Sequence, residues 1–74
     1  MAFRAGMKVV FDVDLLVAWM MKHSITWAQF QKMCNLGRPT LRRLQNGEKI
    51  SYLIARKITF RMDVDPKLIC TYYV

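Results

Sequence analysis

Acidic side chains are scarce in this sequence, and the middle of the chain has none. Only five of the 74 residues are Asp or Glu, and none of them lies between Leu15 and Gly47. Twelve lysines and arginines against these five acids give a net charge of +7. Such a surplus favours an anionic partner, with nucleic acid ahead of a membrane surface or an acidic protein.

The residue patterns of catalytic and metal sites are missing as well. The sequence has no Gly-rich phosphate loop, no HExxH, no Cys/His ligand pair and no Ser/His/Asp set at a supporting spacing. Its lone histidine, His23, has neither a carboxylate nor a nucleophile to work with, and it falls at a predicted helix end. The sequence therefore predicts a protein that is not an enzyme, with no cofactor, no metal and no small-molecule substrate.

Cysteines are few, and long apolar runs do not occur. Cys34 and Cys70 stand in apolar contexts without a paired spacing, which predicts two free, buried thiols in a reducing cytosol. Asp12 and Asp14 interrupt the apolar N-terminal stretch, so we expect no secretory signal. No run approaches the roughly 18 apolar residues of a transmembrane helix, so no membrane partner is expected.

The most informative stretch is Thr26–Gly47, which has the pattern of a helix, a tight turn and a second helix. Thr26 with Gln29 three residues later forms a capping box, which marks the start of the first helix. Asn35 tolerates the left-handed conformation that a sharp turn requires, and Pro39 suits the first turn of the next helix. The stretch thus predicts a helix-turn-helix motif over about 26–47.

The second helix of this motif is basic. It is predicted over about 38–45, ends at Asn46–Gly47, and carries Arg38, Arg42 and Arg43. Three arginines in six residues, with no acid nearby, favour contact with DNA over a merely solvated helix face.

The remaining residues complete one domain, 1–74, with a mainly α fold. A helix is predicted from Asp12 or Asp14 to about His23, another over 52–62 after a Ser51 cap, and a short one after Asp65–Pro66. Segments 7–11 and 70–74 are rich in β-branched and aromatic residues, and we expect them to pair as a small two-stranded sheet. Residues 1–6 are expected to form a flexible arm.

Positions 12–72 resemble the Xre type of helix-turn-helix, the lambda-repressor-like fold of phage Cro and CI repressors. The resemblance includes Ser51 at the start of the fourth helix and the run Met62-Asp63-Val64-Asp65-Pro66 at the family's spacing. Within the motif itself, the matching residues are Thr26, Phe30, Asn35, Leu36, Arg38, Thr40, Leu41, Arg43, Leu44, Asn46 and Gly47. The resemblance implies a five-helix bundle.

The resemblance also implies a function. By this resemblance, we expect a sequence-specific transcriptional regulator of Cro/CI type, of phage or bacterial origin, that acts in the bacterial host cytoplasm. The recognition helix, about 38–45, would enter the major groove of double-stranded DNA, and the protein would bind as a homodimer. The implied DNA-binding residues are Arg38, Pro39, Thr40, Arg42, Arg43, Asn46 and Lys49.

Several residues depart from the family pattern and support an alternative. Trp27 stands where Gln is usual, Glu48 replaces a frequent Lys, and Leu53 and Ile54 are apolar at positions that are mostly polar. Trp27 is equally compatible with packing against the second helix and with insertion into a partner. The alternative is a phage antirepressor, or modulator of repression, whose surface at Trp27, Leu53 and Ile54 binds a protein partner of the same fold.

The sequence also contains more apolar residues than the core of a 74-residue domain can bury. Hydrophobic residues make up 54% of the chain. The surplus set predicts an interface, either with a second copy or with another protein. Its members are Val17, Met21, Leu53, Ile54 and Phe60.

Overall fold

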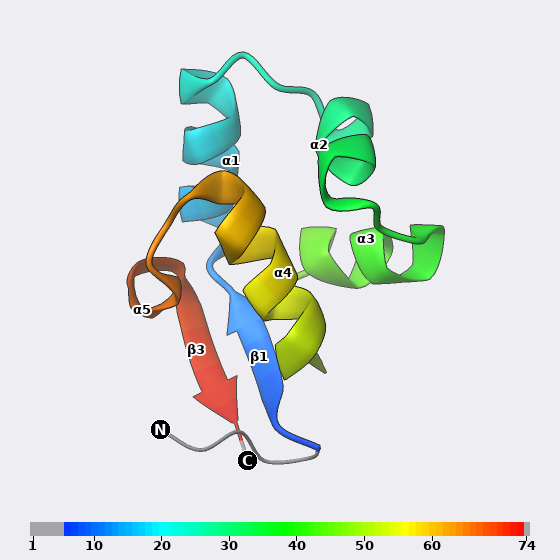
Figure 1. The fold of residues 1–74 in the computed structure, drawn as a ribbon, viewed down its shortest axis with the longest axis vertical. Helices are drawn as coiled ribbons and strands as arrows, with labels where there is room; N and C mark the ends of the chain where they lie inside the picture. Colours follow the sequence, from blue (N-terminus) through cyan, green and yellow to red (C-terminus); the bar gives the residue numbers. More distant parts are fainter. Residues whose placement is uncertain (1–5, 74) are drawn as a thin grey trace.

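Five helices and three short strands follow one another along the chain in a computed structural model that describes residues 6–73 (Figure 1). The mainly helical fold with five helices that the sequence predicts is confirmed. In chain order the elements are β1 (Lys8–Phe11), α1 (Val13–Lys22), α2 (Trp27–Cys34), α3 (Arg38–Gln45), β2 (Ile50–Ser51), α4 (Tyr52–Met62), α5 (Pro66–Ile69) and β3 (Cys70–Tyr73).

The sheet is antiparallel, with strand order β2-β1-β3. The predicted pairing of the two ends of the chain is confirmed, with Val9 opposite Tyr72 and Phe11 opposite Cys70. The sheet has three strands instead of the expected two, because Ile50 also pairs with Val9 on the other edge of β1. A two-residue strand is too short to show the alternation that identifies strands in a sequence. Residues 1–5 of the predicted arm and Val74 of the predicted strand lie outside the described residues.

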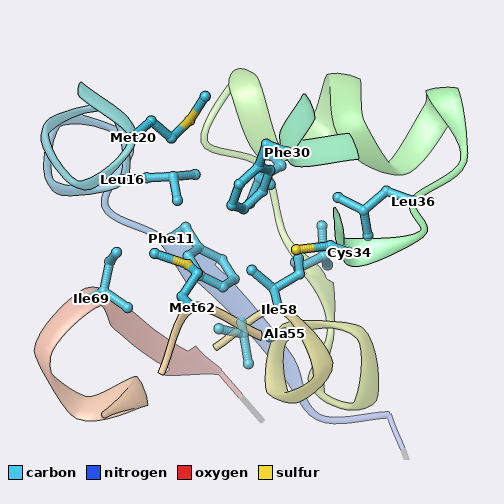
Figure 2. Packing of buried hydrophobic residues seen from close by; sticks show 13 residues of the cluster. Phe11, Leu16, Met20, Phe30, Cys34, Leu36, Ala55, Ile58, Met62 and Ile69 are labelled. Carbon is cyan, nitrogen blue, oxygen red and sulfur yellow. The ribbon is translucent and has the colours of Figure 1, made fainter. Parts of the chain in front are cut away.

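One apolar core joins the sheet to the helices (Figure 2). Strand β1 alternates, so that Val9 and Phe11 are buried while Lys8 is exposed. Phe11 and Phe30 point into the centre of this core, and α4 contributes a buried face with helical spacing. The buried core residues on the helices include Leu16, Met20, Phe30, Cys34, Leu44, Ala55, Ile58, Met62 and Ile69.

Side-chain caps fix where the helices begin. Asp12, Ser51 and Asp65 each accept a backbone N–H of the first turn that follows, and Thr26 with Gln29 forms the predicted capping box. Asp63 ends α4 in the left-handed conformation with φ 58°, a position where a short polar side chain is tolerated.

The surplus apolar residues are only partly exposed. Phe60, Met21 and Leu53 leave 83%, 74% and 62% of their surface in solvent, whereas Val17 and Ile54 are half-buried. Both cysteines are free thiols; Cys34 is buried, and Cys70 is only half-buried.

Candidate nucleic-acid interface

The turn between α2 and α3 is held by its own backbone and by two side chains. Asn35 takes the predicted left-handed conformation, φ 52°, and its N–H reaches the carbonyls of Gln31 and Lys32. The side-chain amide of Gln31 donates to the carbonyl of Leu36 at 3.1 Å. Lys57 of α4 donates to the carbonyl of Asn35 at 3.3 Å. These contacts fix where α3 starts relative to the rest of the molecule.

Sequence reasoning missed the roles of Gln31 and Lys57. The Gln31 contact depends on the left-handed turn, which brings Leu36 back toward α2. The Lys57 contact joins residues 22 positions apart. Neither spacing is a local helix signal, so no short pattern in the sequence would have found them.

Helix α3 has one apolar side and one basic side. Leu44 is buried at 1% exposure and Leu41 is half-buried against the core, so these leucines anchor one side of the helix. Arg38, Arg42 and Arg43 are exposed on the other side, and within residues 6–73 their side chains form no hydrogen bond or ion pair. Their guanidinium groups are therefore available to an external partner.

The arginines surround a shallow hollow together with two other residues. Its lining consists of Arg38, Pro39, Arg42, Arg43 and Glu48. Thr40 lies half-buried in the same first turn. The structure thus brings together five of the seven predicted DNA-binding residues within the first six residues of α3. It also places the Glu48 carboxylate at the rim of the hollow.

The other two predicted residues, Asn46 and Lys49, have partners within the chain. The Asn46 side-chain amide donates to a Glu48 carboxylate oxygen at 3.2 Å. The Lys49 ammonium lies 4.8 Å from the centre of the Tyr73 ring, a cation–π contact with β3. Both residues are exposed, and these contacts orient side chains that would otherwise move freely.

The N-terminus of α3 adds a further positive element. Gly37 is its N-cap and supplies no side-chain acceptor, so no side chain satisfies the first N–H groups. The positive end of the helix dipole lies there beside Arg38. This arrangement favours an anion such as a phosphate.

The three residues predicted for a protein interface differ in how far they are exposed. Leu53 is exposed, and Ile54 is half-buried against the core. Trp27 is half-buried and packs edge-on against Phe30, with ring centres 6.0 Å apart. Trp27 therefore packs within its own helix, and Leu53 is the most exposed of the three.

Nothing in the described part of the chain suggests a metal centre or a membrane span. Residues 6–73 contain no group of three or more His, Cys, Asp or Glu that could hold a metal ion. No helix among them is long and apolar enough to cross a bilayer.

Comparison with known proteins finds similarity in fold. No protein-family model matches this sequence, and no curated protein matches it either. The chain is similar to the crystal structure (form II) of the transcriptional regulator VanUg, with a TM-score of 0.72 and 15% sequence identity. The similarity covers 99% of this chain and 95% of VanUg. At this identity the similarity establishes the fold alone.

Proposed function

We propose that this protein is a sequence-specific DNA-binding transcriptional regulator of the Cro/CI type that acts in a bacterial cytoplasm. The observation that carries the proposal is the exposed, unpaired cluster of Arg38, Arg42 and Arg43 on the second helix of a rigid helix-turn-helix. The stretch between Leu15 and Gly47 contains no acid, so only Glu48 opposes the approach of a polyanion here. The fold shared with VanUg, itself a transcriptional regulator, agrees with this function.

The proposed mechanism divides the site into residues that read bases and residues that hold the backbone. Helix α3 lies in the major groove, where an arginine fork donates two hydrogen bonds to guanine O6 and N7. Arg42 and Arg43 have this role, while Arg38 and the uncapped start of α3 bind phosphate. Thr40 and Pro39 lie against the groove wall, and Asn46 and Lys49 bind a neighbouring phosphate.

Two copies are needed for useful affinity, because one small module contacts only half of a typical operator. We therefore propose that the protein binds double-stranded DNA as a homodimer, with two half-sites about one helical turn apart. Bound regulator then occludes a promoter or recruits the transcription machinery to it.

Repeated selection from a pool of randomised duplex DNA tests this function. The proposal expects the bound fraction to converge on a consensus made of two related half-sites. Failure to enrich any sequence, with binding that falls steeply as salt rises, would show that the +7 charge attracts DNA without reading it.

A second candidate function rests on Glu48 and Leu53. A carboxylate among the arginines weakens DNA binding, and an exposed leucine at the start of α4 suits a protein partner. In this alternative the protein is an antirepressor that binds the DNA-binding domain of a repressor of the same fold. It predicts tight binding to such a domain and weak, non-specific DNA affinity.

The substitutions Leu53→Ser and Trp27→Ala test this alternative, because both are expected to weaken the complex with the repressor domain. If both variants left that complex intact, the alternative would be wrong.

A further inference from the structure

A groove runs along α4, between this helix and the chain that forms α5 and β3. Two neighbouring hollows of about 410 and 320 Å³ make up the groove, and they share Arg56 and Pro66 in their linings. Ala55 and Thr59 are buried along its α4 side. The Thr59 hydroxyl donates to the carbonyls of its own helix, so it leaves no unmet polar group there. The groove is thus a mainly apolar surface.

The two ends of the groove have different shapes. At one end Phe60 projects with 83% of its surface exposed, which is unusual for so large an apolar side chain. At the other end Tyr52, Cys70 and Tyr72 line the larger hollow, where the two tyrosine rings meet edge-on with centres 5.9 Å apart. One end therefore offers a protruding ring, and the other offers an aromatic recess.

The charges at the two ends of the groove also differ. Lys67 lines the recess end, while Asp63 and Asp65 line the end where Phe60 projects. Arg56 borders both hollows, so it belongs to neither end alone. A second copy turned through a twofold axis across the groove would place its acids opposite Lys67, and its projecting ring opposite this recess. Self-complementarity of this kind is what an isologous dimer requires.

We propose that this groove is a homodimer interface, in which Phe60 of each copy fills the Tyr52–Tyr72 recess of the other. The acidic pair Asp63 and Asp65 of each copy then faces Lys67 of the other across the twofold axis. The inference deepens the proposed function, which needs two copies on one operator, by assigning the surface that joins them.

The position of the groove is compatible with DNA binding. In Figure 1, α5 and β3 lie on the opposite side of the molecule from α3. A dimer formed through the groove therefore leaves Arg38, Arg42 and Arg43 of both copies exposed.

Sedimentation equilibrium of the full chain without DNA tests the interface. The wild-type protein is expected to show a reversible monomer–dimer equilibrium, and Phe60→Ser to raise its dissociation constant at least about tenfold. The matched control is Met21→Ser, which removes another exposed apolar side chain, on α1 outside the groove. It is expected to leave the equilibrium unchanged. Far-UV circular dichroism checks that both variants remain folded, as expected for substitutions at exposed positions.

Reversing a charge provides a second test of the interface. Lys67→Glu places like charges opposite Asp63 and Asp65 of the partner copy, and it is expected to weaken the dimer more at low salt than at high salt. A wild-type protein that stays monomeric throughout the concentration range would overturn the proposal. So would a dimer that Phe60→Ser and Met21→Ser affect equally. Because no DNA is present, neither result bears on whether α3 reads a base sequence.

Discussion

At the scale of single residues, the three arginines of α3 and the two flanking polar residues have different surroundings. The Arg43 guanidinium is exposed and has no partner among residues 6–73, whereas Lys49 lies over the Tyr73 ring and the Asn46 amide donates to Glu48. A free guanidinium can adopt the bidentate geometry that a guanine edge demands. A lysine held beside β3 acts instead as a fixed point charge, which suits a phosphate.

The first prediction follows from this difference. Arg43→Ala is expected to cost about 1–3 kcal/mol on the selected operator and little on random DNA, so it relaxes specificity at one base position. Fluorescence anisotropy with both duplexes measures the two losses. An equal loss on both would show that Arg43 does not read a base.

Lys49→Ala is the matched comparison for Arg43→Ala. It is expected to weaken binding to every sequence by a similar factor and to lower the slope of log affinity against log salt by about one. Lys22→Ala, which removes a charge at the end of α1, controls for the general loss of positive charge and should leave the selected contacts intact.

Cys70 gives a prediction about pH. Burial raises the pKa of the Cys70 thiol to about 12 from an ordinary value of 9.0, and burial also raises the pKa of Cys34 despite the nearby Arg61 and Lys57. The native state keeps these protons at a pH where the unfolded chain has lost them. This contribution to stability is therefore complete below pH 9.0 and is lost progressively as the pH rises toward about 12.

Urea unfolding at about pH 8 and about pH 10.5 tests this dependence. Wild-type protein is expected to lose more stability between the two values than Cys70→Ser, because serine does not titrate in this range. Equal losses of unfolding free energy in the two proteins would show that the Cys70 thiol does not cause the pH dependence.

At the scale of elements, the helix-turn-helix depends on the conformation of one residue. Asn35 sits at φ 52°, where a residue with an ordinary Cβ is strained. We expect Asn35→Ala to lower the free energy of unfolding by about 1–2 kcal/mol. Asn35→Gly should be close to neutral, since glycine adopts this conformation without strain. Urea titration of the two variants measures the difference, and a similar loss in both would mean that the turn is set by other contacts.

The sequence predicted the elements better than the contacts between them. The caps at Thr26 and Ser51 and the turn at Asn35 follow from local sequence signals, so they were predicted and confirmed. Strand β2 was missed because two residues show no periodicity.

In the candidate site, too, local features were predictable from the sequence, whereas contacts between distant segments were not. The basic side of α3 is visible in the sequence because Arg38, Arg42 and Arg43 alternate with Leu41 and Leu44 at helical spacing. Contacts that bring distant segments together, such as Lys57 with Asn35 and Lys49 with Tyr73, depend on how the elements pack. Whether these residues contact DNA stays a prediction.

At the scale of the whole molecule, two faces are available for partners. In Figure 1, α3 lies on one side of the molecule, and α5 and β3 lie on the other. The arginines belong to α3, and the groove is lined by α4, α5 and β3. The core in which Phe11, Phe30 and Ile58 pack together connects the two sides. Close packing of this core fixes the orientation of α3 relative to the groove, so a dimer through the groove would hold two recognition helices at a set spacing.

The central claim is that α3 reads a DNA sequence, and one ratio tests it most directly. Fluorescence anisotropy at about 0.15 M salt gives the affinity for the best selected duplex and for a scrambled duplex of equal composition. The account predicts a dissociation constant near ~10⁻⁸ M for the first and a preference of at least about 10³ over the second. A preference within about tenfold, with both constants near ~10⁻⁵ M, would contradict sequence reading and leave charge attraction as the only interaction with DNA.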